Sequence, residues 1–461
     1  MIFNSLAYLL FLPAVFVGFR LVPASWRIPL LLLASYFFYG WWDFRFLGLI
    51  VLSTLVDYYS ARRIHTAARP SVRRRWLTFT LVANLGILGF FKYWGFFVES
   101  AGEMLATIGL GVSDALLDVI LPVGISFYTF QTMSYTIDVY RGHLEPEQRL
   151  DRFALFVSFF PQLVAGPIER ATNMLPQIRR LSGRLAPVEW SPALTLIARG
   201  LFRKVVIADG IAPVANEVFA TPDRYGGVTL LVGVIAFSLQ IYGDFAGYTD
   251  IARGSARLFG VELMENFRAP YTATGFSDFW RRWHISLSTW LRDYLYIPLG
   301  GNQKRGLATV RNLMITMLLG GLWHGAGWGF VIWGGLHGLY LVLERVAARF
   351  TGSRARLPSW LVFTVVTLTW VPFRAPDLAT ALTVWEGIFQ PFGGAQLAFA
   401  PISVLVMGLL TILLDRADTV GRLDPLKTTP AFARGFGYGV AAIVAILYWP
   451  VSASPFIYFQ F

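Results

Sequence analysis

Long apolar runs recur along the whole chain, separated by short clusters of arginine, and this pattern restricts the possible folds more than any other feature. A helix needs roughly 20 apolar residues to cross the hydrocarbon core of a bilayer, and most of the runs approach that length. Within a bilayer, backbone polar groups must bond inside the spanning structure, so only helices and closed barrels can cross it. The lengths of the runs favour helices. We therefore expect an all-α, polytopic integral membrane protein.

The composition supports this expectation and removes several function classes. Of the 461 residues, 56% are hydrophobic and 14% are charged, whereas a soluble domain carries roughly 25% charged residues. Cysteine is absent, which excludes disulfides, thiolate metal ligands and an acyl-cysteine intermediate on this chain. The net charge of +12 comes from arginines between the apolar runs. This placement fits the positive-inside rule, so we expect membrane lipid and no nucleic acid as a partner.

The arginine clusters also predict a topology. Ala61 to Arg75 carries six arginines and is the firmest cytoplasmic anchor. It places the N-terminus outside and orients the spans expected near 4–22, 27–42, 46–60, 76–98 and 119–138. Residues 153–168 are short and contain Pro161 and Pro167, so we expect a re-entrant segment there.

We expect the whole chain, 1–461, to form one continuous membrane domain in four parts. Residues 1–250 hold the N-terminal spans, which end with those near 190–208 and 228–250. Residues 251–311 carry many arginines and are expected at the cytoplasmic face or the interface, and 312–345 form a hairpin with a glycine-rich bend. Residues 346–461 hold spans near 358–373, 398–414 and 435–450.

Five histidines are present, and their settings differ. His65 and His143 lie beside arginines and are expected to be solvated loop residues. His324 lies in an apolar hairpin among Gly320, Gly321, Gly325 and Gly327, where an ionisable side chain is costly and indicates function. The glycines also fit close helix packing. His337 lies in an equally apolar run, and a structural role is as plausible there as a catalytic one.

Three further groups complete the candidate chemistry. Residues 278–296 have the spacing of an amphipathic interfacial helix, with Trp280, Trp283 and Trp290 on one face and His284 on the polar face. Asp244 falls within an expected span and needs a partner, either a histidine to orient or an arginine. Asp250 is expected nearer the interface.

Two sequence segments resemble the paired histidine segments of the membrane-bound O-acyltransferase family. They are Asp278-Phe279-Trp280-Arg281-Arg282-Trp283-His284-Ile285-Ser286-Leu287-Ser288 and Leu322-Trp323-His324-Gly325. Phe160-Pro161-Gln162-Leu163-Val164-Ala165-Gly166-Pro167-Ile168 and residues 122–130 are similar to the branch that contains the membrane subunit of alginate O-acetylation. The resemblance extends over essentially the whole chain.

The resemblance implies a ring of about 10–12 transmembrane helices, with re-entrant and interfacial helices, around a central funnel or tunnel. His324 corresponds to the family's essential histidine and His284 to its second histidine. Asp244, His337 and Trp323 are expected to support them. Arg281 and Arg282 are candidates for binding the phosphates of an acyl-coenzyme A donor.

The expected function is therefore transfer of an acyl group, acetyl first, from cytoplasmic acyl-coenzyme A to hydroxyls of an extracytoplasmic polysaccharide. Alginate, cellulose and peptidoglycan are the acceptors considered, reached directly or through a periplasmic SGNH-type acyltransferase partner. Neither a bound cofactor nor a metal is expected, and the location is the bacterial inner membrane. The alternative from another class is a secondary transporter or flippase with His324, Asp244 and Asp250 as a proton relay.

Overall fold

The computed structural model describes most of the chain as two compact, helical units. The described residues are 1–109, 119–164, 166–303, 306–352, 356–390, 394–419, 432, 439–440, 443–444, 446–449 and 456–457. Among them every regular element is a helix, and one isolated bridge joins Tyr225 to Ala395. The first unit comprises residues 1, 6–189 and 255–264, and the second comprises 2–5, 190–254 and 265–461. The expected all-α membrane fold is confirmed.

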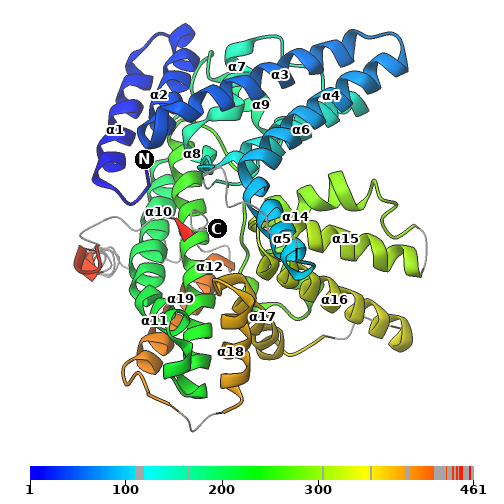
Figure 1. Cartoon of the computed structure of the whole chain (residues 1–461). Coiled ribbons are helices and arrows are strands. Elements are labelled where there is room, and N and C mark those ends of the chain that lie inside the picture. The colour runs from blue at the N-terminus through cyan, green and yellow to red at the C-terminus, as the bar shows by residue number, and fades with distance from the viewer. Residues whose placement is uncertain are drawn as a thin grey trace. The chain divides into compact units, whose positions relative to one another are not determined.

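The first unit consists of nine described α-helices with short connections. They are α1 (Leu6–Leu21), α2 (Arg27–Asp43), α3 (Leu47–Thr66), α4 (Pro70–Leu88), α5 (Trp94–Thr107), α6 (Ile125–Arg141), α7 (Leu150–Ser158), α8 (Phe160–Leu163) and α9 (Ala171–Arg180). A π-helical turn, Gly89–Tyr93, joins α4 to α5, and 3-10 turns at Ala24–Trp26 and Phe44–Phe46 precede α2 and α3. In Figure 1, α3 and α4 run side by side as a long hairpin.

The arginine-rich segment between α3 and α4 is mostly helical, whereas the sequence suggested a loop. Helix α3 continues to Thr66 and α4 begins at Pro70, so only residues 67–69 connect them. Arginine is a good helix former, and proline is tolerated in the first turn, so both helices continue past their apolar parts. His65 consequently lies in the last turn of α3, where it is exposed.

A buried carboxylate joins three helices of the first unit. Asp57 on α3 is fully buried and accepts hydrogen bonds from Thr80 Oγ1 and from Asn84 Nδ2, at 2.9 Å for the latter, both on α4. Thr136 Oγ1 on α6 donates to the same carboxylate at 2.9 Å. An unpaired carboxylate inside an apolar bundle would be costly, so these donors fix the register of α3, α4 and α6.

The segment expected to be re-entrant is broken into two short helices. Helix α7 ends at Ser158, and α8 covers only Phe160–Leu163 before the chain turns. Pro161 occupies the first turn of α8, where its missing N–H costs no helical hydrogen bond. Residues 153–164 are buried within their unit. The depth of this segment in the bilayer stays a prediction.

The second unit holds the remaining described helices. They are α10 (Trp190–Leu201), α11 (Asp209–Ala220), α12 (Gly227–Leu258), α13 (Phe276–Arg282), α14 (Ile285–Leu291), α15 (Leu307–His324), α16 (Trp328–Thr351), α17 (Ser359–Arg374), α18 (Leu378–Ile388) and α19 (Ala400–Thr419). π-Helical turns at Phe202–Ala208 and Arg292–Tyr296 follow α10 and α14, and 3-10 turns lie at Pro222–Arg224 and Pro270–Thr272. The last residues of α12, 255–258, belong to the first unit.

The expected hairpin is formed by α15 and α16, which pack backbone against backbone (Figure 1). A Cβ atom at Gly321 would lie 2.2 Å from the carbonyl oxygen of Phe330, and one at Gly334 would lie 2.3 Å from that of Met317. Only glycine permits this approach, so small residues bring the two helices together. Close packing therefore accounts for Gly321, one of the glycines around His324.

Four helical segments are long and apolar enough to cross a membrane, by length and composition. Among the described residues they are Ala24–Thr66, Pro70–Thr107, Gly227–Leu258 and Trp328–Thr351. The helical run expected to end near residue 208 continues through α11 to Ala220, and α18 was not expected. The span predicted near 435–450 falls largely outside the described residues.

Candidate active site

His324 is the last residue of α15, directly before the glycine-rich bend of the hairpin. It is 3% exposed. Three aromatic rings surround its imidazole, with centroids 5.1 Å away at Trp323, 5.1 Å at Trp333 and 5.5 Å at Phe373. These rings come from α15, α16 and α17, so three helices create an apolar setting around one ionisable group.

His284 lies at a break between two helices, not on a continuous amphipathic one. Helix α13 ends at Arg282, α14 begins at Ile285, and His284 between them has a φ of 43° and a ψ of 53°. A non-glycine residue in this left-handed region carries backbone strain of about 1–2 kcal/mol. Such strain persists where the surroundings hold the residue in place, and it is concentrated at functional sites.

Asn266 holds the backbone on the C-terminal side of this break. Its main-chain oxygen accepts a hydrogen bond from Ile285 N at 2.9 Å, and its Oδ1 accepts one from Ser286 N at 3.2 Å. Asn266 is itself fully buried. No periodic pattern in the sequence indicates Asn266, because it lies in the irregular stretch after α12.

The polar-face position predicted for His284 was wrong. Its side chain is fully buried, and Trp283 and Trp290, expected as interfacial anchors, are buried within the protein. The helical break turns His284 inward, and this turn cannot be read from a spacing that assumes one continuous helix. Burial lowers the pKa of His284 to about 3, so the imidazole is neutral at pH 7.

The two histidines meet inside the second unit. Their ring centroids are 6.1 Å apart with an interplanar angle of 64°. Trp323 lies near both rings, 5.7 Å from that of His284. Phe245 on α12 covers another side of His284 at 4.6 Å. Two buried imidazoles in an aromatic enclosure can exchange protons with a substrate, and the surrounding rings exclude competing water.

His337 has a structural partner. Its Nε2 and Thr369 Oγ1 lie 3.1 Å apart, which joins α16 to α17. Its ring packs against Trp333 at 4.8 Å and Trp280 at 5.2 Å. Trp333 contacts both His324 and His337, so His337 supports the wall of the site.

The two aspartates of α12 are occupied by ion pairs. Asp244 Oδ1 lies 2.9 Å from Lys204 Nζ, so its partner is neither a histidine nor an arginine. Asp250 accepts hydrogen bonds from Arg199 Nε at 2.8 Å and from Arg203 Nη1 at 2.8 Å. Asp250 is 3% exposed and is therefore buried in the protein, whereas its depth in the bilayer stays a prediction.

The basic residues that pair with these aspartates are visible in the sequence, but they were not predicted as partners. Arg199, Arg203 and Lys204 all fall within the run expected to span near 190–208, at spacings that place them on neighbouring turns. Charges inside an apolar run require partners. Pairing them with Asp244 and Asp250 was possible from the sequence alone, although a choice between alternative pairings was not.

Arg281 and Arg282 lie on α13, which leads into the break at His284. Both pair with Asp278, at 3.4 Å from Arg281 Nη2 and 3.0 Å from Arg282 Nε. The Arg281 side chain is 61% exposed, so most of it is free to meet a ligand. Their assignment to phosphate binding stays a prediction.

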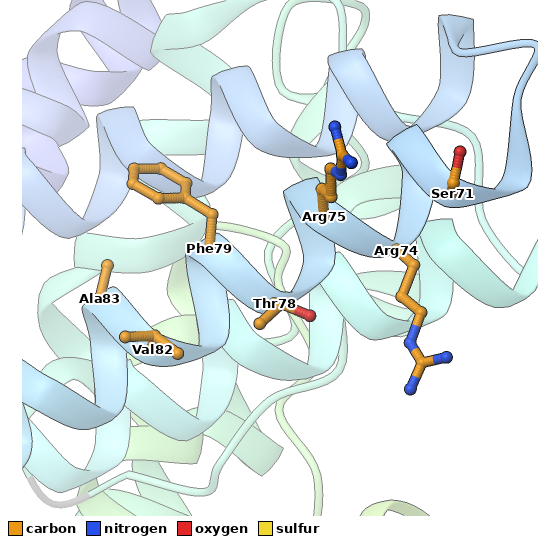
Figure 2. A pocket seen from close by; sticks show the side chains of 7 residues that line it. All are labelled: Ser71, Arg74, Arg75, Thr78, Phe79, Val82 and Ala83. Carbon is orange, nitrogen blue, oxygen red and sulfur yellow. The ribbon is translucent and has the colours of Figure 1, made fainter.

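His143 and the groove on α4 take no part in the histidine cluster. His143 is exposed, and its Nδ1 lies 3.9 Å from Asp138. The groove in Figure 2 is lined by α4 alone, with Arg74 and Arg75 near one end and Phe79 and Val82 farther along.

Within the described ranges, no group of three or more histidine, aspartate or glutamate residues is placed to hold a metal ion.

Comparison with known sequences shows the family of this chain. Residues 149–366, which include both histidines, match the profile of the membrane-bound O-acyltransferase family. The probable alginate O-acetylase of Azotobacter vinelandii is 38% identical over 100% of this chain and 100% of that protein. The chain belongs to this family. It is therefore a multi-pass membrane O-acyltransferase.

Two other relatives carry different names. A peptidoglycan O-acetyltransferase of Helicobacter pylori is 38% identical over 84% of this chain and 80% of that protein. A teichoic acid D-alanyltransferase of Bacillus subtilis is 26% identical over 54% of this chain and 65% of that protein. The family relationship thus includes proteins named for different polymers and acyl groups.

Proposed function

We propose that this protein transfers an acetyl group from cytoplasmic acetyl-coenzyme A to hydroxyls of an extracytoplasmic polysaccharide at the bacterial inner membrane. The observation that carries the proposal is the pair of buried imidazoles, His284 and His324, 6.1 Å apart in an aromatic enclosure. The names of the relatives support a cell-envelope polymer as acceptor, and alginate is the first candidate.

His324 is the general base in this proposal. Its imidazole takes the proton of the acceptor hydroxyl while the hydroxyl oxygen attacks the thioester carbonyl. The tetrahedral intermediate then collapses, the carbon–sulfur bond breaks, and coenzyme A leaves as the thiol with the proton returned by His324. A neutral imidazole suits this cycle because it can accept and return a proton near neutral pH.

His284 orients the thioester and donates to its developing oxyanion. A neutral imidazole carries one N–H, so it can do this without a positive charge. Its strained backbone, held by Asn266, fixes the direction of the ring. Arg281 and Arg282, at the exposed end of α13, bind the phosphates of the coenzyme. Acetyl-coenzyme A is then a donor substrate, and no resident cofactor is required.

The acetyl group can reach the polymer by two routes. The acceptor hydroxyl belongs either to the polysaccharide or to a periplasmic SGNH-type acyltransferase that completes the transfer. The transporter alternative loses support because Asp250, one of its relay groups, lies between two guanidinium groups. Neighbouring positive charges favour the ionised form of a carboxylate, so Asp250 is a poor proton carrier.

The test is complementation in hosts that lack their own membrane acetylase. The chain and its His324→Ala variant are expressed at equal levels in Pseudomonas aeruginosa lacking its alginate O-acetylase, and polymer acetyl content is measured. We expect acetylation to be restored by the wild type and reduced about 10²–10⁴-fold by the substitution, the typical contribution of a general base. His65→Ala is the matched control, because His65 is exposed on α3.

Two results would contradict the proposal. Full acetylation by well-inserted His324→Ala would remove the catalytic role of His324. The wild type could fail to acetylate the polymer in this host and yet restore peptidoglycan acetylation in Helicobacter pylori lacking its own enzyme. That result would refute alginate as the acceptor and leave the proposed chemistry in place.

A further inference from the structure

Phe456 and Ile457 lie far along the chain from both histidines, yet they are buried in the second unit, with exposures of 0% and 2%. The ring of Phe456 packs on two residues of α12, with centroids 4.5 Å away at Tyr248 and 5.5 Å away at Phe245. A short segment that is distant in sequence therefore covers the helix face that carries Phe245.

Phe245 connects this segment to the candidate site. Its ring centroid lies 4.6 Å from that of His284. Phe267 packs against Phe245 at 5.1 Å and Trp323 lies 5.7 Å from His284. Because interiors are close-packed, a change in volume at Phe456 is transmitted to the rings that follow it.

A hydrogen bond anchors the same segment to the residue before Phe245. Ile457 N donates to Asp244 Oδ2 at 2.6 Å. Lys204 Nζ holds the other oxygen of Asp244 at 2.9 Å and also reaches Asp209 Oδ1 at 2.8 Å. A charge-assisted bond to a carboxylate that is itself fixed is strong and directional. The anchor therefore fixes the place of Phe456 against α12.

We propose that Phe456 and Ile457 are positioning residues of the acyl-transfer site, acting through Phe245 and Asp244 on the orientation of His284. This inference rests on the proposed acetyl transfer. His284 has a strained backbone, so the direction of its ring depends on the packing around it. A misplacement of about 1 Å in a catalytic constellation can reduce the rate about 100-fold.

The experiment compares substitutions at Phe456 with one elsewhere. Phe456→Ala removes the support for Phe245, and Phe456→Leu restores most of the volume. Phe153→Ala is the matched control, because Phe153 is equally buried but belongs to the first unit, where it packs on Tyr135 and Phe156. Each protein is purified in detergent, its folded fraction is measured by size-exclusion chromatography, and kcat and KM are measured with acetyl-coenzyme A.

We expect Phe456→Ala to lower kcat per folded molecule about 10- to 100-fold with KM for acetyl-coenzyme A little changed. Phe456→Leu should recover most of that loss, and Phe153→Ala should lower the folded fraction but not kcat. Asp244→Asn, which removes the charge that holds Ile457 N, should lower kcat in the same direction.

The inference fails if Phe456→Ala turns over at the wild-type kcat, or if it loses kcat no more than Phe153→Ala does. If Phe456→Ala does not fold, kcat of Asp244→Asn decides, and a wild-type kcat in that folded variant overturns the inference. If the wild-type protein shows no acetyl transfer, or if its turnover does not depend on His324, the proposed acetyl transfer itself is refuted.

Discussion

Replacement of Asp250 by asparagine tests how much the buried ion pairs of the second unit contribute to its stability. Asp250 on α12 accepts from Arg199 through both guanidinium positions, Nε at 2.8 Å and Nη2 at 2.5 Å, and from Arg203 Nη1 at 2.8 Å. Arg203 also bonds Asp415 on α19 at 2.8 Å. The four side chains are between 4% and 6% exposed, so water replaces none of these bonds.

The asparagine keeps the size of the side chain but removes the negative charge that faces Arg199 and Arg203, while Arg203 keeps its bond to Asp415. Breaking a buried ion pair from one side typically costs about 3–5 kcal/mol, because the remaining charge stays buried without compensation. We therefore expect Asp250→Asn to lower the free energy of unfolding by about 3–5 kcal/mol. The double variant with Arg199→Gln should lose less than the sum of the single variants, with a coupling of about 0.5–3 kcal/mol.

The assay is denaturant unfolding of the purified protein in detergent micelles, followed by tryptophan fluorescence. Asp43→Asn is the matched control: Asp43 and Arg45 form a similar bidentate pair at 2.5 Å, but the Arg45 side chain is 62% exposed. Solvent screens that pair, so its loss should be far smaller. Equal effects of Asp250→Asn and Asp43→Asn, or strict additivity with Arg199→Gln, would refute the reasoning.

Three further predictions concern the histidines. The free energy of unfolding of His284→Gly should exceed that of His284→Ala by about 1 kcal/mol, because glycine adopts a φ of 43° without strain. A more stable alanine variant in the same titration would argue against a strained backbone. Thr369→Val removes the 3.1 Å bond to His337 and should destabilise the fold by about 1–3 kcal/mol while acetyl transfer persists in the folded fraction; an inactive but stable variant would give His337 a chemical role. Because burial lowers the pKa of His284 to about 3, the unfolded chain binds more protons than the folded one below about pH 6.5. Wild-type stability should therefore decrease as the pH falls from 7 towards 4, more steeply than in His284→Gln, and parallel pH profiles would count against a buried neutral imidazole.

The general architecture could be predicted from the sequence because bilayer solvent imposes long apolar segments and internal backbone bonding. The hairpin of α15 and α16, with His324 directly before its bend, followed from apolar runs on both sides of a glycine-rich stretch. The ends of the helices were less predictable. Apolar content marks where a helix enters lipid, whereas α3 continues into arginines, which also favour helix.

The geometry of the candidate site was predicted only in part. The sequence selected His284 as a candidate, but its predicted place on a polar helical face was wrong, because the helix breaks at that residue. The pairing of Asp244 with Lys204 was also not predicted. Several cations in one apolar run offered partners of equal merit, and only the packing of the π-helical turn Phe202–Ala208 against α12 selects among them.

The sequence by itself determined that this chain is a helical membrane protein with an ionisable group at an apolar bend, because the cost of burying polar groups acts on each segment locally. Only the tertiary structure decided which side chains meet. It brings the rings of His284 and His324 to 6.1 Å from each other, bonds Asn266 to Ser286 N and packs Phe456 on Phe245. Each of these contacts joins segments far apart in the chain. Such contacts depend on helix packing and on one left-handed backbone conformation, which residue spacing does not encode.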